Sequence, residues 1–182
     1  HEPGVAYVTK NGFRFDRFDA HVYKTIDFGK TWTSIAGDLP QSPINVVFED
    51  RVNPRLLFVG NDLGAFASID GGRHWAALQR NMPVVPVKDL LVHPRENDLV
   101  LGTYGRGLYV ADVSVLQQLS SEVLNEDLHL FNIENGVVRH PQRSDWGAYH
   151  MTGDRHLATE NELPGLKINY YLRNPSGDVP EI

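Results

Sequence analysis

The stretch Thr25-Ile26-Asp27-Phe28-Gly29-Lys30-Thr31-Trp32 decides the fold, because it occurs a second time as Ser68-Ile69-Asp70-Gly71-Gly72-Arg73-His74-Trp75. The two octets lie 43 residues apart. Further positions are related by the same offset: Pro40 to Pro83, Pro43 to Pro86, Val47 to Leu90, Leu56 to Leu99, and 64–66 to 107–109. The chain therefore contains an internal repeat, and the repeat is the first constraint on its architecture.

Each repeat contains four short runs of β-branched, aromatic or aliphatic residues, bounded by Gly, Pro, Asn and Asp. In the best-defined unit these runs predict strands at 44–48, 56–59, 64–68 and 74–78. The next unit repeats three of them at 87–92, 98–101 and 108–111, and the preceding unit has 5–8, 21–24 and 31–35. A period of about 40 to 50 residues with four strands is typical of a propeller blade. We therefore predict an all-β chain whose residues 1–113 form a partial β-propeller of about 2.5 four-stranded blades.

The repeat stops after residue 113, and the remaining sequence has a different character. Residues 114–165 begin with short helical turns and continue as an irregular, polar linker. The run 166–172 alternates apolar and polar residues and is followed by the turn signal 174–178, so 166–182 is predicted to begin another, C-terminal β domain. At about 43 residues per blade, we expect the chain to be a fragment of a larger propeller protein.

Composition excludes several classes of function. The 182 residues include no cysteine, which excludes disulfides, thiolate nucleophiles and Cys-ligated metals. The net charge of −6 argues against nucleic acid as a partner, and no run of about 18 apolar residues predicts a membrane span. His150 and His156 flank Asp154 at a spacing that does not share a helical face, so we expect solvated loop residues, no metal site and no cofactor.

Each octet lies between the third and fourth strands of its unit and is a hairpin connection. Asp side chains there accept hydrogen bonds from their own turn, Gly supplies positive φ, and Trp packs at the start of the next strand. Structural roles are thus predicted for six residues: Asp27, Gly29, Trp32, Asp70, Gly72 and Trp75. The alternative is that the aspartates bind calcium or a substrate, but one carboxylate per turn is a poor site for a hard cation.

The octet pattern resembles the Asp-box, or BNR repeat, with the second copy departing only at His74. Residues 91–100 and 102–110 are similar to the C-terminal blades of large bacterial sortilin-like and glycosyl-hydrolase-like BNR proteins. Residues 1–8 resemble an internal stretch of that family, and 166–172 resemble the start of the β-sandwich that follows its propeller. The resemblance implies a secreted or periplasmic protein.

Strand alternation divides the loops between two faces of such a propeller. One face carries the octets and the turns between the first and second strands of each unit. The other face, here called the loop face, carries the loops between the second and third strands and the connections between blades. Candidate ligand-binding residues on the loop face are Asn61, Asp62, Tyr104, Arg106 and Arg80. Glycoside hydrolysis needs two carboxylates roughly 5 to 9.5 Å apart, so the candidate catalytic residues are Asp62 with Asp16, Asp19 or Asp38. The alternative is that these residues form turns and carry solvated charges.

These observations and the resemblance lead to two hypotheses. The first is a fragment of a glycosyl-hydrolase-like Asp-box propeller that binds carbohydrate at the loop face, and that is a glycoside hydrolase if it is an enzyme. The second is a non-catalytic propeller of the sortilin type, which binds a protein or peptide or serves as a scaffold. Both predict that the chain packs against remaining blades, from the same protein or from another copy, and that its ligand is a polysaccharide or a protein.

Overall fold

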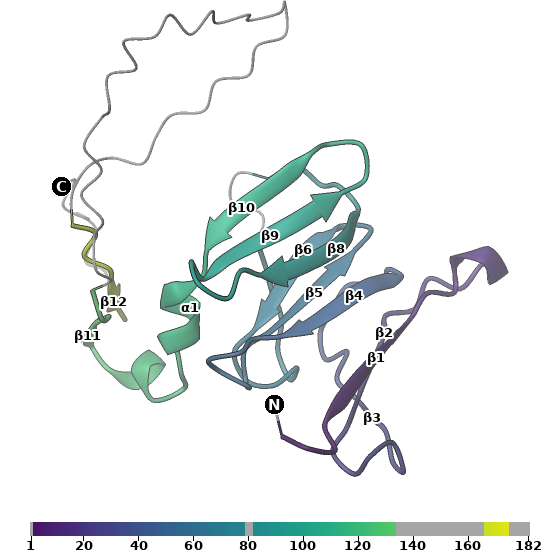
Figure 1. The fold of residues 1–182 in the computed structure, drawn as a ribbon, viewed down its shortest axis with the longest axis horizontal. Coiled ribbons are helices and arrows are strands. Elements are labelled where there is room, and N and C mark those ends of the chain that lie inside the picture. Colours follow the sequence, from purple (N-terminus) through teal and green to yellow (C-terminus); the bar gives the residue numbers. More distant parts are fainter. Residues whose placement is uncertain (1, 79–81, 134–165, 175–182) are drawn as a thin grey trace, which may run out of the picture.

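The computed structural model describes residues 2–78, 82–133 and 166–174. These residues form an all-β structure with antiparallel sheets and almost no helix (Figure 1). Three sheets follow one another along the chain and have three, four and three strands. The first contains β1 (Ala6–Lys10), β2 (His21–Thr25) and β3 (Thr33–Ser34). The second contains β4 (Ile44–Glu49), β5 (Leu57–Asn61), β6 (Gly64–Ser68) and β7 (Ala76–Ala77), and the third contains β8 (Val87–Val92), β9 (Asp98–Thr103) and β10 (Leu108–Asp112).

The strands lie where the repeat predicts them, but β3 and β7 are shorter than the predicted 31–35 and 74–78. In the second sheet the reason is local. The backbone N–H of Trp75 donates to Asp38 Oδ1 at 2.7 Å, so this N–H does not take part in strand pairing with β6. The pairing of the fourth strand with β6 therefore begins at Ala76, continues through Ala77, and ends with a hydrogen bond from Leu78 N to Ala65 O at 2.8 Å.

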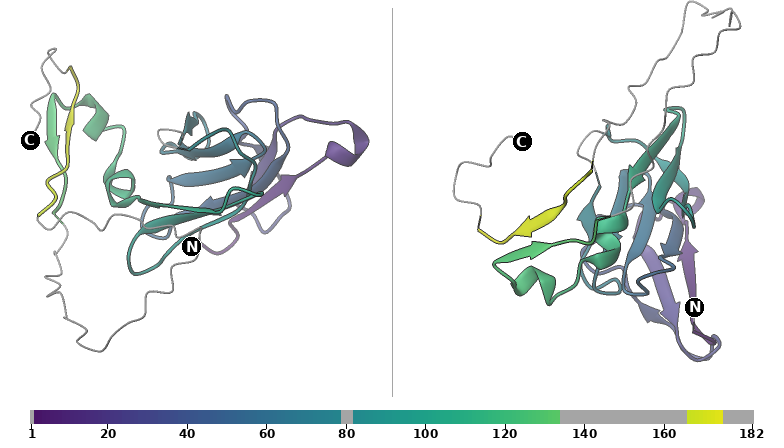
Figure 2. Two further views of the ribbon diagram at one scale, coloured as in Figure 1. Left: turned by 90° about the horizontal axis from the view of Figure 1, so that it is seen from above. Right: turned by 60° about the vertical axis from the view of Figure 1, so that its left-hand side comes forward.

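The second sheet lies between the other two (Figures 1 and 2). One face packs on the first sheet through buried Leu57, Val59 and Phe66 against Val22. Its opposite face packs on the third sheet in a second cluster. That cluster includes the buried side chains of Leu56, Phe58, Ala65, Ala67, Val87, Leu90, Leu99 and Leu101. The apolar character of β5 follows from this position, because a strand buried on both faces alternates between two cores rather than between core and solvent.

The pairing register corrects one detail of the predicted repeat. Glu49 pairs with Leu57, and the equivalent Val92 pairs with Leu99. Leu99 therefore corresponds to Leu57 and not to Leu56, because the turn between β8 and β9 is one residue shorter than the turn between β4 and β5. The longer β9–β10 loop restores the offset, so that Tyr109 corresponds to Phe66.

The segment after the third sheet contains α1 (Ser114–Gln118), η2 (Val123–Asn125) and β11 (Leu128–Leu130). β11 pairs with β12 (Tyr170–Leu172), so part of the predicted linker forms a strand with the predicted start of the next domain. Val113 is buried in the core between the second and third sheets, which attaches this segment to them. Within the described ranges the sheets do not close into a ring, and none of the helices there is long and apolar enough to cross a membrane.

Candidate functional site

Two β-bulges at equivalent positions begin the candidate site. The pairing shifts between Ile44 and Val46 in the second sheet, and between Val87 and Asp89 in the third. The extra residues are Asn45 and Lys88, which lie 43 residues apart in the sequence. A bulge bends the strand and redirects a side chain, so both residues leave the regular alternation of their strands.

Both bulged residues reach the same carboxylate. Asn45 Nδ2 donates to Asp62 Oδ1 at 2.9 Å, and Lys88 Nζ donates to the same oxygen at 2.7 Å. Asn11 Nδ2 in turn donates to Asn45 Oδ1 at 2.9 Å. We call Asn11, Asn45, Asp62 and Lys88 the polar ladder. Because its members come from all three sheets, the ladder joins the sheets at the end opposite the octets.

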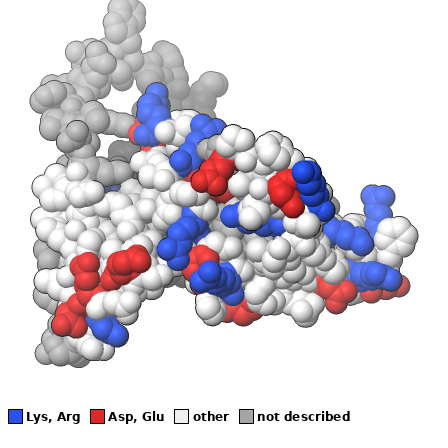
Figure 3. Space-filling model, turned by 90° about the horizontal axis from the view of Figure 1, so that it is seen from below, with Lys and Arg blue, Asp and Glu red and all other residues white. Residues whose placement is uncertain are grey.

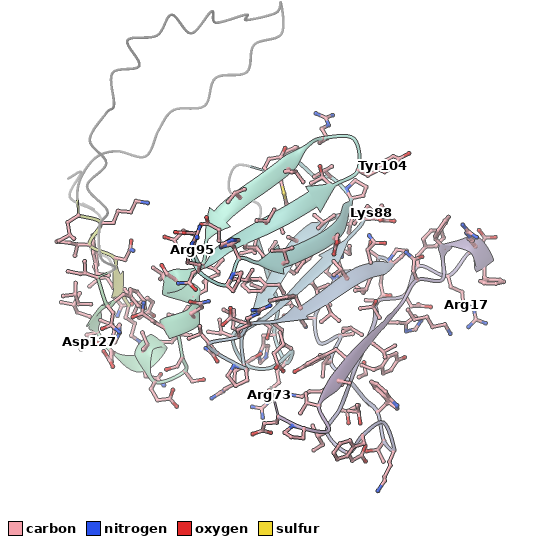
Figure 4. The ribbon with its side chains drawn as sticks, viewed as in Figure 1. Arg17, Arg73, Lys88, Arg95, Tyr104 and Asp127 are labelled. Carbon is pink, nitrogen blue, oxygen red and sulfur yellow. The ribbon has the colours of Figure 1, made fainter. Side chains whose placement is uncertain are left out.

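The ladder follows the repeat. Asn11, Asp62 and Tyr104 occupy the same position in successive sheets, directly after β1, β5 and β9. Tyr104 is anchored through its backbone N–H, which donates to Pro86 O at 2.8 Å, while its side chain is exposed. Lys88 and Tyr104 lie at one end of the third sheet and Arg95 at the other, as Figure 4 shows. Arg106 is exposed in the same loop as Tyr104.

The surroundings of Asp62 keep it ionised. Burial raises the pKa of Asp62, but the hydrogen bonds from Lys88 and Asn45, together with the Lys88 charge, outweigh burial and lower it below the usual range. An ionised carboxylate accepts hydrogen bonds but cannot donate a proton. Asp62 is therefore suited to accept ligand hydroxyl groups and unsuited to act as a general acid at neutral pH.

The other predicted carboxylates do not join Asp62 in the ladder. Asp38 binds the N–H of Trp75, which directly follows the second octet's turn, whereas Asp62 precedes the opposite end of β6. Five residues of extended strand separate these ends by about 16 Å. Asp16 lies in an exposed loop after β1, and Asp19 is 3.9 Å from His21. Arg80 lies outside the described residues.

Asn61 is inside the protein and does not line an open surface. Its Oδ1 accepts hydrogen bonds from the backbone N–H groups of Leu63 (2.8 Å) and Gly64 (3.0 Å), which closes the β5–β6 turn. The side chain is completely buried, and its Nδ2 has no partner within the described part of the chain. Its position supports a structural role in the turn rather than contact with a ligand.

An exposed aromatic loop adjoins the ladder. Residues 11–20 connect β1 to β2, where the equivalent β5–β6 connection is a tight turn. The loop contains η1 (Phe13–Phe15) and projects away from the sheets, with Arg17 near its tip (Figures 1 and 4). Phe13, Phe15 and Phe18 are all exposed, Phe15 at 80%. These phenylalanines are absent from the predicted site, although their alternation with charged residues is a visible signal in the sequence.

Charge at the surface does not identify the site by itself. Figure 3 shows Lys and Arg interspersed with Asp and Glu across one face. The projecting loop itself carries Arg14 and Arg17 beside Asp16 and Asp19, so it has no net charge. In the described ranges, His, Asp and Glu do not gather in groups of three or more that could hold a metal ion. The ladder is consequently distinguished by its hydrogen bonds and its repetition.

The octets form two closely similar turns. Asp27 accepts hydrogen bonds from Thr31 N (2.8 Å) and Thr31 Oγ1 (2.6 Å). Asp70 accepts one from His74 N at 3.0 Å, and its Oδ2 lies 2.6 Å from His74 Nδ1. Hydrogen bonds from Thr31 lower the pKa of Asp27 to about 2. The pKa of Asp70 is also about 2, because its hydrogen bonds outweigh the opposing effect of burial. Each carboxylate therefore accepts hydrogen bonds from its own turn, which supports a structural role.

The glycines and tryptophans of the octets complete this arrangement. Gly29 and Gly72 have φ of +84° and +92°, a conformation that glycine adopts without steric cost. Trp75 is 9% exposed and donates from Nε1 to Ile35 O at 3.0 Å, whereas Trp32 is 43% exposed and donates to Gly29 in its own turn. Trp75 therefore connects two repeats, and Trp32 does not do so within the described residues.

A shallow pocket of about 240 Å³ lies at the octet end, between the first and second sheets. Its lining includes Tyr7, Glu49 and Arg51. Tyr7 donates its hydroxyl to Glu49 Oε2 at 2.5 Å, and burial together with this carboxylate raises the pKa of Tyr7 well above its usual range. A phenol in this state remains a neutral donor, so the pair ties β1 to β4 and is unsuited to nucleophilic chemistry.

Comparison with solved structures finds a similarity to an ancestral GH74 enzyme. That structure matches 58% of this chain with 20% sequence identity and a TM-score of 0.48. The chain spans only 13% of the length of that enzyme. No protein-family model matches the chain, and no curated protein matches its sequence.

Proposed function

We propose that the chain is part of a glycosyl-hydrolase-like Asp-box propeller that binds carbohydrate at the loop face, with Asp62 as the central acceptor. The polar ladder is the observation that carries this proposal. Asp62 Oδ1 is held by Asn45 and Lys88, while Oδ2 receives no hydrogen bond from the described part of the chain. The Asp62 side chain is 36% exposed and that of Lys88 45%, so both are accessible to a ligand.

This arrangement matches the chemistry of a sugar. Neighbouring hydroxyl groups donate to a carboxylate and accept from an ammonium group, and the ladder offers these two groups side by side in Asp62 and Lys88. The Asn45 amide donates to Asp62 and to Val87 O, so it positions the carboxylate and is not itself offered to the ligand. Small-molecule sites combine a few such polar groups with aromatic surface. Exposed Tyr104 and the aromatic loop at 13–18 would supply that surface on either side of the ladder.

Binding is favoured over catalysis for this part of the protein. Hydrolysis of a glycosidic bond needs a second carboxyl group at about 5 to 9.5 Å, and one of the pair must be protonated. Asp62 is held ionised, and Asp38 lies at the opposite end of β6. If the whole protein is a glycoside hydrolase, we propose that its acid comes from other blades. The resemblance of the octets to Asp-boxes supports such blades, as well as a secreted or periplasmic location.

The alternative is a sortilin-type propeller that binds a protein or peptide. The aromatic loop favours this alternative, because its three exposed phenylalanines offer an apolar anchor without needing the ladder. The two functions predict different effects of mutation. Loss of the Asp62 charge would weaken sugar binding at least tenfold and leave binding through the loop unchanged.

The test is isothermal titration of the full 182-residue chain with soluble β-glucan, xyloglucan and sialosides. We expect saturable binding to one of them and at least tenfold weaker binding for Asp62→Asn. Glu96→Gln serves as the control, because Glu96 is an exposed carboxylate in the turn at the opposite end of the third sheet. Equal affinities for Asp62→Asn and the original chain, or no binding to any of the three, would contradict the proposal.

A further inference from the structure

The contact between the second and third sheets shows how one sheet of this repeat packs on the next. Phe58, Ala65 and Ala67 of the second sheet are covered by the third. Gly60 makes the closest approach, since a Cβ atom added there would lie 2.7 Å from Val87 Cγ1 and 2.8 Å from Val46 Cγ1. The second sheet therefore has no side chain at the point where Val87, next to the bulged Lys88, packs against it.

The third sheet repeats this face, but nothing described covers it. Leu91 pairs with Val100, and Val100 pairs with Val110. In the second sheet the equivalent row is Phe48, Phe58 and Ala67, of which Phe48 is half-buried and the other two are buried. Leu91 is 47% exposed, Val110 62% and Leu108 72%. This apolar surface of Leu91, Val100, Leu108 and Val110 is here called the outer face.

Gly102 is the counterpart of Gly60. Gly60 pairs with Val46 and Ala65, and Gly102 pairs with the equivalent Asp89 and Leu108. A Cβ atom added at Gly102 would meet Asp89 O at 3.5 Å, an ordinary contact, and no side chain of a neighbouring sheet. The third sheet therefore has a glycine, Gly102, at the position where Gly60 of the second sheet leaves room for a side chain of the next sheet.

The polar ladder is open at the same place. Asp62 receives Lys88 from the sheet that follows it. Tyr104 stands at the equivalent position in the third sheet, is 74% exposed, and has no such donor among the described residues. The third sheet thus covers the apolar face around Gly60 and supplies Lys88 to Asp62. No described residue does the same for the face around Gly102 or for Tyr104.

We propose that the outer face docks a further antiparallel sheet of the same repeat, supplied by polypeptide other than the described residues. Its first strand places a β-branched side chain over Gly102 and a bulged polar residue beside Tyr104, and the interface continues the one already formed by β8 on β4 and β5. A second copy of this chain does not fit these requirements. Its remaining open sheet face belongs to the first sheet, where β1 corresponds to β5 and a counterpart of β8 is absent among the described residues. The proposal does not depend on carbohydrate binding.

The absence of cysteine makes the outer face directly measurable. Val110→Cys places a thiol on it, and Ala67→Cys places one at the equivalent buried position of the second sheet. In the 182-residue chain we expect the thiol of Val110→Cys to react with a thiol reagent at least tenfold faster than that of Ala67→Cys, at a rate independent of protein concentration. A rate that falls as concentration rises would show that a second copy covers the face and would overturn the proposal.

Docking is tested by extending the full chain. Insertion of a second copy of residues 69–111 after Ala111 keeps the repeat in register, because Ala111 is equivalent to Ser68. This insertion adds a fourth strand to the third sheet and a further sheet behind it. We expect the labelling of Val110→Cys to slow at least tenfold in the extended chain, and the additional substitution Gly102→Val to restore fast labelling. Fast labelling in an extended chain that unfolds at the same urea concentration as the original would overturn the proposal.

A second comparison needs only the original chain and covers the case in which the extended chain does not fold. Gly60→Val should lower the urea midpoint strongly, since the new side chain meets Val87, whereas Gly102→Val should leave the midpoint nearly unchanged. Equal destabilisation by the two substitutions would mean that the outer face is already filled, which contradicts the proposal.

Discussion

Gln117 donates its side-chain amide to Oδ2 of Asp50 at 2.9 Å, and this aspartate is only 1% exposed. The other oxygen of Asp50 accepts the backbone N–H groups of Val52 and Asn53, each at 2.8 Å. The Gln117 backbone carbonyl also accepts a hydrogen bond from Asn53 Nδ2 at 3.1 Å. One residue of α1 therefore holds the β4–β5 turn, which explains how the segment after the third sheet is fixed to the second.

Gln117→Ala should lower the free energy of unfolding by about 1 to 3 kcal/mol, the cost of leaving a buried carboxylate oxygen without its donor. Urea denaturation measures this, and the dependence on urea concentration should be unchanged. Gln118→Ala is the matched control, because the hydrogen bonds of the Gln118 side chain go to the backbones of Ser114 and Asn132. A loss for Gln117→Ala no larger than that for Gln118→Ala would show that the hydrogen bond to Asp50 adds nothing to stability.

Trp75 and Trp32 should respond differently to the same substitution. Trp75→Phe removes a buried ring N–H that bonds Ile35 O in the preceding repeat, whereas Trp32→Phe removes one that bonds Gly29 in its own exposed turn. We expect a loss of about 1 to 2 kcal/mol for Trp75→Phe and less than about 0.5 kcal/mol for Trp32→Phe. Urea midpoints of the two variants give the comparison, and similar losses would contradict the structural difference between the two octets.

His74 should make the stability of the second octet depend on pH. Its hydrogen bond to Asp70 and the charge of that carboxylate raise the pKa of His74 above its usual value. The stabilisation is fully present below the unfolded-state pKa of about 6.5 and is lost as pH rises through the higher folded-state pKa. His74→Thr, which introduces the residue of the first octet, should flatten this dependence. Melting temperatures of both proteins between about pH 5 and 9 test it, and parallel profiles would contradict it.

The sequence predicts the local parts of this structure better than the contacts between sheets. The octet turns depend on residues within four positions of Asp27 or Asp70, so their geometry follows from the pattern. The ladder depends on bulges at Asn45 and Lys88, which strand alternation does not reveal. Likewise, the loop pattern groups Asp38 with Asp62, but the chain between β3 and β4 passes the second octet before it returns to the loop end. The pairing of β11 with β12 joins distant segments, which no local pattern indicates.

Lys88→Met should raise the pKa of Asp62, because it removes both a hydrogen bond and a positive charge that oppose the effect of burial. The titration of the Asp62 side chain, followed by NMR, measures the shift directly. Arg95→Met is the control, since Arg95 pairs with Glu96 at the opposite end of the same sheet. If Asp62 is the acceptor for sugar hydroxyls, Lys88→Met should also make sugar binding weaken as pH falls through the raised pKa. An unchanged pKa for Asp62 would mean that Lys88 does not hold the carboxylate in solution, and the ladder would then end at Asp62.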